Sequence, residues 1–188
     1  MIIKEQKLKG VFAIQWERYK DFRGGLVRTY DKCKFDEFGI DSNWSQESIS
    51  NTLKKNTLRG LHVSLPPTVE GKLINHSRGA MIWVIVDLRK DSFTFGHHEK
   101  FEISKTQTES IFVPKGFAHG CLSLSDNCEL IIKSNAFFVE QNGTGIRCND
   151  PQLGIDWGVH ERNLTILTRD GNYPLFQSFL DGYKFIEI

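Results

Sequence analysis

The sequence predicts a single all-β domain, an antiparallel sandwich or barrel with a few short helices. Short stretches rich in β-branched and aromatic residues recur along the chain, and glycine, proline and asparagine turns separate them. Fourteen phenylalanines raise the aromatic content to 12%, which favours strands over helices. The chain has 188 residues, a length that fits one domain able to bury its own core.

The predicted strands lie in the middle of the chain. They are Lys72–Asn75, Met81–Leu88, Lys100–Ile103, Ser110–Val113, Gly120–Leu124 and Leu130–Lys133. Turns are predicted between and after them, at Ser77–Gly79, Pro114–Gly116, Ser125–Asn127 and Gln141–Gly143. This regular alternation of short strands and turns is typical of antiparallel sandwiches and barrels.

Helical patterns are scarce. Arg28–Phe38 is expected to hold one short helix, and a second is expected near the C-terminus. The segment Asp41–Asn56 is polar throughout and predicts an exposed strand and loop. Because no repeat, low-complexity tract or linker interrupts the pattern, residues 1–188 are expected to form one domain.

The charges nearly cancel, with 24 basic and 23 acidic residues and a net charge of +1. Such a chain has no broad positive field to attract nucleic acid or an anionic membrane. Any anion must therefore be held by a few placed cations. Arg23, Arg59, Lys72 and Lys115 are candidates because each is adjacent to a glycine, which allows close approach to a phosphate.

Two further observations predict a cytoplasmic protein. The segment Met1–Lys9 is charged rather than signal-like, and no apolar run approaches the length of a membrane span. The four cysteines form no C-x-x-C pair and are expected to be reduced thiols that fill the core.

Two histidines follow turns that contain glycine, His62 in Leu58–His62 and His119 in Pro114–Gly120. Each could be a satisfied structural residue or could present its imidazole at the mouth of a barrel. Neither has a second ligand at the spacing that a metal site requires, so no metal is predicted. The adjacent His97 and His98 are expected at the surface.

Several longer motifs occur in a fixed order along the chain. They are Asp21–Gly24, Leu58–His62, Gly71–Leu73, Val86–Gly96, Val113–Gly120 and Asn149–Trp157. In sequence and spacing they resemble the dTDP-4-dehydrorhamnose 3,5-epimerase family over about residues 8 to 175. The resemblance implies a cupin-like, jelly-roll β-sandwich that pairs as a homodimer, with the N-terminal strands helping to complete the partner's site.

The resemblance also implies a reaction: epimerisation of a nucleotide-linked 4-keto-6-deoxyhexose without metal or cofactor, in deoxysugar biosynthesis for O-antigen-type polysaccharides. The ketone at C4 acidifies the hydrogens at C3 and C5, so a base can remove one as an enolate forms. His62 matches the family's base. A histidine suits that role because its ordinary pKa of about 6.5 lies close to working pH. Asp170 matches the carboxylate that orients His62, and Lys72 the cation at the enolate oxygen.

The substrate contacts follow from the same resemblance. Arg59, Arg23 and His119 match residues that contact the pyrophosphate or sugar, and Arg169, next to Asp170 in Thr168–Gly171, is a further candidate for substrate binding. Gln46 matches a nucleotide-binding position, and Phe138 an aromatic residue against the base. Arg28 and Ser48 occupy the positions where the family has an acid and an asparagine.

Two departures concern the sugar end of the pocket. Ile132 stands where the family has a tyrosine that donates a proton to the opposite face of the enolate, and Trp83 replaces an acidic residue. Loss of a positioned acid lowers a rate by about 10²–10⁴-fold. The sequence therefore predicts epimerisation at one carbon, or a substitute donor such as water, His119 or another tyrosine. Arg28 reverses a charge at the nucleotide end and makes cytidine- or guanosine-linked sugars candidates.

Two alternatives stay open. A related 3,4-ketoisomerase would need a single base and no acid on the opposite face. A catalytically inactive homologue would bind the sugar nucleotide without turnover. The presence of His62, Lys72 and Asp170 together favours an enzyme, since binding alone requires no base dyad.

Overall fold

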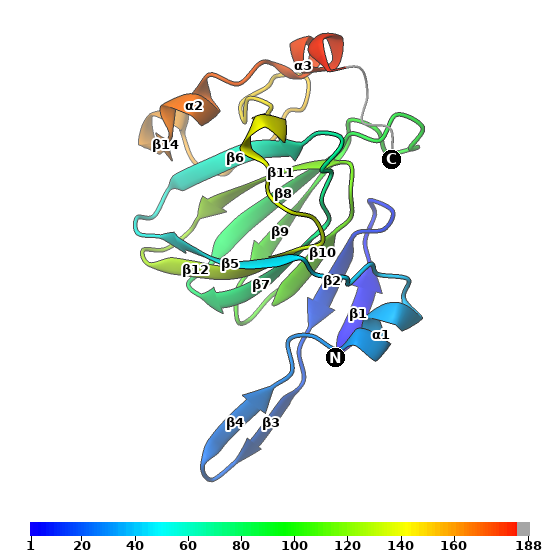
Figure 1. Ribbon diagram of the computed structural model, residues 1–188. Coiled ribbons are helices and arrows are strands. Elements are labelled where there is room, and N and C mark those ends of the chain that lie inside the picture. Colours follow the sequence, from blue (N-terminus) through cyan, green and yellow to red (C-terminus); the bar gives the residue numbers. More distant parts are fainter. Residues whose placement is uncertain (184–188) are drawn as a thin grey trace.

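Two antiparallel β-sheets face each other in the protein, whose computed structural model describes residues 1–183 (Figure 1). The first sheet has the order β1 (Ile2–Glu5), β2 (Phe12–Gln15), β10 (Ser110–Val113), β7 (Lys72–Arg78), β12 (Cys128–Ser134) and β5 (Gln46–Thr52). The second has the order β13 (Gly143–Gly145), β6 (Thr57–Ser64), β11 (Phe117–Ser123), β8 (Met81–Asp87) and β9 (His98–Ile103). A short strand, β14 (Thr165–Ile166), pairs in parallel with β6. The predicted all-β sandwich is confirmed.

Each of the six predicted strands is present, but several are longer than the sequence indicated. Strand β7 continues to Arg78, so the turn expected at Ser77–Gly79 begins later, and β11 begins at Phe117 rather than Gly120. His62 lies inside β6, a strand that the sequence did not outline because a glycine interrupts its pattern. The polar Asp41–Asn56 segment contains β5, an exposed edge strand as expected.

The main core lies between the two sheets, where inward residues of both meet. Ile74 and Leu130 of the first sheet pack in one cluster with Trp83, Ile85 and Phe101 of the second. Burial of each such side chain contributes about 1.5–3 kcal/mol to folding. This cluster forms the floor of the space in which the candidate site lies.

The C-terminal segment covers the outer face of the second sheet. It contains η1 (Glu140–Asn142), η2 (Glu161–Asn163), α2 (Thr168–Gly171) and α3 (Phe176–Gly182), the last being the helix predicted near the C-terminus. Phe176 and Phe179 of α3 pack with Leu61 and Val84 of the sheet in a second core. Figure 1 shows α2 and α3 above β6, which places Asp170 next to the strand that carries His62.

The N-terminal helix α1 (Lys32–Glu37) lies within Arg28–Phe38, the segment that was expected to hold one short helix. Asp31 caps it by accepting a hydrogen bond from the Lys34 N–H at 3.3 Å. Phe35 is its buried residue, whereas Cys33 is exposed. The expectation of four buried cysteines is therefore wrong for Cys33, because a six-residue helix that buries Phe35 turns Cys33 away from the core. The other three cysteines are buried.

Strands β3 (Arg18–Asp21) and β4 (Gly24–Val27) form a hairpin that belongs to neither sheet. We call it the arm; Figure 1 shows it projecting from the sandwich. The arm exposes large side chains: Phe22 is 98% exposed, Leu26 67% and Tyr19 60%. Among residues 1–183, no helix is long and apolar enough to span a membrane.

Candidate active site

His62 and Asp170 form a hydrogen-bonded pair at the junction of β6 and α2. His62 Nε2 lies 3.0 Å from Asp170 Oδ2, and the Gly60 N–H donates to the same oxygen at 2.8 Å. Asp170 is 2% exposed. Burial alone would raise the pKa of its carboxyl, but the hydrogen bonds from His62 and Gly60 hold that pKa below its ordinary value. Asp170 is thus a carboxylate that holds a proton on Nε2 and leaves Nδ1 of His62 as the basic nitrogen.

A glycine suits position 60 because the backbone of β11 lies close to it. Its φ of +104° lies in the region that favours glycine, and an added Cβ would come within 2.7 Å of the His119 carbonyl oxygen. The pairing of β6 with β11 also shifts register between His119 and Cys121. A larger residue at position 60 would separate the strands and move its N–H away from Asp170.

His119 is the direct partner of His62 across β6 and β11, so both side chains lie on the inner face of the sheet. The two ring centroids are 6.3 Å apart, and His119 stacks on Trp83 at 5.4 Å. Burial, and then the charges of Lys72 and His62, place the pKa of His119 well below its ordinary value. His119 is therefore a neutral imidazole and a poor proton donor.

Lys72 lies at the start of β7 and is held by Glu70. Its Nζ is 2.8 Å from Glu70 Oε1, and Ser64 Oγ donates to the same oxygen at 2.8 Å. Ser134 Oγ donates to Oε2. Burial alone would raise the pKa of Glu70, but the Lys72 charge and these hydrogen bonds lower it. Ser64 lies two residues beyond His62 on the same face of β6. Glu70 therefore connects Lys72 of the first sheet to the strand that carries His62.

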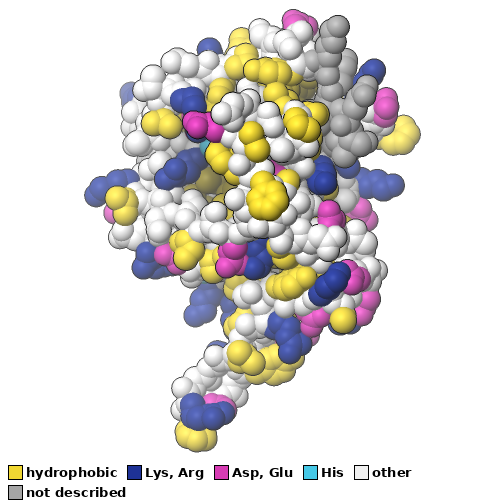
Figure 2. All heavy atoms as spheres, in the orientation of Figure 1, with side chains coloured by type: hydrophobic (Ala, Val, Ile, Leu, Met, Phe, Trp, Pro, Cys, Tyr) yellow, Lys and Arg dark blue, Asp and Glu magenta, His cyan; other side chains and the backbone are white. Residues whose placement is uncertain are grey.

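Predicted nucleotide-contacting residues gather with Lys72 around a small cavity of about 190 Å³. Ser48 pairs with Ile132, and Gln46 with Ser134, across β5 and β12. The cavity is lined by Gln46, Ser48, Glu70, Lys72, Ile132, Ser134 and Phe138. Gln46 Oε1 accepts a hydrogen bond from the Phe138 N–H at 2.6 Å. Figure 2 shows a hollow on this face with hydrophobic side chains on its floor, a histidine at its edge and Lys or Arg side chains around it.

The Arg59 side chain, on β6, forms hydrogen bonds to β5, the edge strand of the first sheet. Its Nη2 donates to the Asn51 carbonyl at 3.1 Å, and its Nε to Thr52 Oγ1 at 3.4 Å. The side chain is exposed, so the guanidinium remains accessible at the rim. Arg169 is also exposed, and its Nε donates to Asp170 Oδ1 at 3.3 Å. Arg169 therefore contacts the base dyad, in addition to the substrate contact that the sequence predicted.

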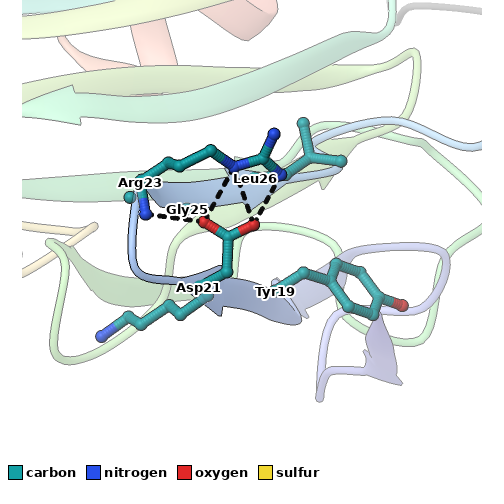
Figure 3. A pocket seen from close by; sticks show the side chains of 7 residues that line it. Tyr19, Asp21, Arg23, Gly25 and Leu26 are labelled. Atoms are coloured by element: carbon teal, nitrogen blue, oxygen red, sulfur yellow. Dashed lines mark hydrogen bonds and ion pairs between the residues drawn. The ribbon is translucent and has the colours of Figure 1, made fainter.

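Arg23 and Arg28 do not join this cluster within one protomer. Arg23 lies in the turn of the arm, where its guanidinium folds back over Asp21 with Nη2 2.7 Å from Oδ2 (Figure 3). Arg28 follows the arm and pairs with Asp31 at 3.1 Å. The physical reason is that the arm points away from the sandwich, so its tip cannot reach the protomer's own cavity.

Comparisons with known proteins identify the family of the chain. A model of the dTDP-4-dehydrorhamnose 3,5-epimerase family matches residues 5–178. The chain belongs to this family. The epimerase is 35% identical to the dTDP-4-dehydrorhamnose 3,5-epimerase of Methanothermobacter thermautotrophicus, over 88% of this chain and 89% of that protein. Its class of reaction is isomerisation.

Solved structures and one further relative extend the comparison. The dTDP-4-dehydrorhamnose 3,5-epimerase of Elizabethkingia anophelis has a TM-score of 0.89 and 31% identity, over 95% of this chain and 97% of its own. The Legionella pneumophila enzyme, solved with dTDP-4-keto-L-rhamnose, has a TM-score of 0.86 and 29% identity, over 94% and 93%. A Streptomyces niveus dTDP-4-dehydrorhamnose 3-epimerase is 28% identical, over 84% of this chain and 76% of that protein.

Sequence reasoning missed Glu70 and did not single out Tyr173 of the epimerase. Glu70 could have been noticed as an acid two residues before Lys72 in an otherwise uncharged segment. Tyr173 lies three residues after Asp170, and its ring is 6.1 Å from that of His62. Its spacing from Asp170 was the available signal.

A metal site was not expected, and the described part of the chain, residues 1–183, contains no group of three or more His, Cys, Asp or Glu residues placed to hold one.

His97 is exposed as expected, whereas His98 is half-buried. Burial and the nearby Lys100 lower the pKa of His98.

Proposed function

We propose that this epimerase inverts one carbon, C3 or C5, of a nucleotide-diphosphate-linked 4-keto-6-deoxyhexose, without metal or cofactor. The observation that carries the proposal is the His62–Asp170 pair at 3.0 Å, with the Lys72–Glu70 pair on the facing sheet and bonded to Ser64 of the strand that carries His62. Forming an enolate next to a ketone requires a base to take the proton and a positively charged group to stabilise the oxygen.

The proposed mechanism uses the chain's own groups. Nδ1 of His62 takes the proton from the carbon beside the ketone, and the electron pair of that C–H bond moves into the enolate. Asp170 stabilises the imidazolium that forms, because its carboxylate stays ionised. The Lys72 ammonium stabilises the charge that develops on the ketone oxygen. A water molecule then protonates the same carbon from the opposite face, and His62 returns the proton it took to the hydroxide that remains.

Restriction to one carbon is supported by the composition of the cavity wall. Ile132 faces the cavity and has no proton to donate, and Trp83 lies against His119 in the core. Within residues 1–183 no tyrosine lines this cavity. Water is then the remaining donor to the opposite face. A relative named as a 3-epimerase in Streptomyces niveus is consistent with single-carbon action in this family.

The substrate contacts remain part of the proposal. We assign Gln46, Ser48 and Phe138, which line the cavity, to the nucleotide, and we assign Arg59 and the neutral His119 to the pyrophosphate and sugar. Relatives are named for thymidine-linked substrates, and Arg28 and Ser48 are the residues that would favour cytidine or guanosine instead. The cytoplasm stays a prediction from the sequence.

A dimer is proposed as the working form. The arm exposes Phe22 and Leu26, which a single protomer leaves uncovered, and it carries Arg23 away from the protomer's own cavity. Insertion of the arm into a partner would bury these side chains and supply Arg23 to the partner's pyrophosphate site.

The direct test is solvent exchange followed by NMR in heavy water, with thymidine-, cytidine- and guanosine-linked 4-keto-6-deoxyhexoses. We expect deuterium at one carbon of one substrate, and none with His62→Ala. Equal exchange and inversion at C3 and C5 would contradict restriction to one carbon. Movement of the ketone would indicate a 3,4-ketoisomerase, and binding without exchange would indicate an inactive homologue.

A further inference from the structure

Tyr173 lies against the base of the proposed reaction. Its ring meets the imidazole of His62 edge to face, with centroids 6.1 Å apart and planes at 86°. We propose that Tyr173 is a positioning residue: its ring holds the His62 imidazole so that Nε2 stays on Asp170 and Nδ1 stays free to act as the base. The inference rests on the proposed role of His62 as the base.

Arg147 anchors the backbone at Tyr173 and at the residue after it. Arg147 Nε donates to the Tyr173 carbonyl at 3.2 Å, and the Arg147 N–H donates to the Pro174 carbonyl at 2.9 Å. Tyr173 also follows α2 directly, three residues after Asp170. The segment that supplies the carboxylate therefore also supplies the ring, and both reach His62 from one anchored turn.

Gly145 makes the space that the ring occupies. Gly145 pairs with His62 across β13 and β6, so a side chain there would lie on the same face as the imidazole. An added Cβ would lie 2.4 Å from two ring carbons of Tyr173. The ring of Tyr173 thus takes the place of a side chain next to His62, while His119 occupies the other side. The imidazole therefore has an aromatic ring on each side.

The location of Tyr173 excludes a role as the donor to the opposite face. It lies beside His62 over the second sheet, whereas Lys72 and Ile132 come from the first sheet. Burial and the Asp170 charge raise the pKa of its phenol, although Arg169 opposes the rise, so the hydroxyl stays protonated. A ring that orients the base, rather than a hydroxyl that transfers a proton, fits both facts.

The other tyrosines lie elsewhere and provide a contrast. Tyr30 packs on Phe35 and Trp44, Tyr19 lies on the arm, and Tyr183 packs on Phe179 at 5.1 Å. Tyr183 is a matched control because it is a partly exposed aromatic residue of the same C-terminal segment without a contact to the dyad.

The test compares Tyr173→Ala, Tyr173→Phe and Tyr183→Ala in the full chain. With a thymidine-linked 4-keto-6-deoxyhexose, we expect Tyr173→Ala to lower kcat by about tenfold or more with KM unchanged, because a misplaced base loses the reactive geometry. Tyr173→Phe and Tyr183→Ala should retain the wild-type kcat. Equal loss in Tyr173→Phe and Tyr173→Ala would overturn the proposal, because it would assign the effect to the hydroxyl.

A substrate-free measurement separates this inference from the proposed function. In imidazole ¹⁵N NMR spectra, His62 should show the Nε2–H tautomer in the wild type and in Tyr173→Phe, and a mixture of tautomers in Tyr173→Ala. An unchanged tautomer in Tyr173→Ala would overturn the positioning role even if the epimerase were active. Absence of exchange in the wild type would defeat the proposed function and leave this result to decide the role of the ring.

Discussion

The two nitrogens of His62 lie in different surroundings, and this difference determines what the residue can do. Nε2 faces a buried carboxylate, while Nδ1 has no hydrogen-bond partner among residues 1–183. A neutral imidazole with its proton held at Nε2 is ready to accept a proton at Nδ1. The chemistry of the base therefore depends on Asp170 remaining ionised.

Asp170→Asn tests that dependence. The amide keeps the shape of the side chain but cannot stabilise an imidazolium, and it can donate to Nε2 and so favour the wrong tautomer. We expect solvent exchange into the sugar to fall by about 10²–10⁴-fold. Asp181→Asn, on the exposed side of α3, is the control and should leave the rate unchanged. Wild-type exchange in Asp170→Asn would remove the dyad from the mechanism.

Glu70 provides a prediction about stability at different pH values. Its folded-state pKa is lowered, chiefly by Lys72 against the opposing effect of burial, so its stabilisation is present above the ordinary carboxyl pKa and is lost as the pH falls through the folded value. At about pH 7, Glu70→Gln should lower the free energy of unfolding by about 1–3 kcal/mol. At about pH 3 the difference from the wild type should shrink. Urea unfolding at both pH values measures it; a difference that does not change with pH would contradict the assignment.

At the scale of one element, strand β12 shows how alternation places a side chain in the cavity. Ile132 faces inward beside Ser48 and Ile74, while the adjacent Ile131 lies on the other face of the strand. The same residue type therefore occurs one position apart in two different environments. This offers a matched pair for substitution.

Ile132→Tyr should restore a proton donor to the first sheet's side of the cavity. If the missing acid limits the reaction, exchange at the face opposite His62 should rise, by up to about 10²–10⁴-fold. Ile131→Tyr introduces the same side chain away from the cavity and should have no effect on exchange. The measurement is NMR detection of deuterium at C3 and C5. An unchanged or lower rate in Ile132→Tyr would count against the account of the missing acid.

At the scale of the whole molecule, the arm determines whether one protomer contains a complete site. Arg23 lies at its turn and contacts Asp21 of the same hairpin. If the arm of each protomer serves its partner, Arg23 and His62 in any one site come from different chains. That arrangement can be tested with dimers that contain two different variants.

Mixed dimers of Arg23→Ala and His62→Ala chains should regain activity that neither variant has alone. Half of the dimers are mixed at equal concentrations, and each mixed dimer holds one complete site, so about a quarter of the wild-type rate is expected. Differently tagged chains confirm that subunits have exchanged. Mixed dimers without activity would show that Arg23 does not act across the interface, and a monomer in sedimentation analysis would rule out the dimer itself.

Much of the fold could be predicted from local patterns. Met81–Asp87 and Ser110–Val113 form strands because β-branched and aromatic residues between turn signals favour the extended conformation locally. Strand β6 escaped prediction because Gly60 disrupts its pattern, and the reason for that glycine is a close approach of His119 that no local pattern encodes. The arm escaped prediction because its pairing is short and its apolar residues are exposed.

The sequence by itself determined the all-β class and the neutral charge balance, and its resemblance to the family predicted that His62, Asp170 and Lys72 act together. These depend on residue type and order, which the chain carries directly. Only the tertiary structure decided that Glu70 holds Lys72, that the Tyr173 ring contacts His62 and that Arg23 lies outside the cavity of its own protomer. Asp170 is separated from His62 by 108 positions in the chain. Contacts over such distances arise from the pairing of strands and the docking of the C-terminal segment, so local sequence cannot specify them.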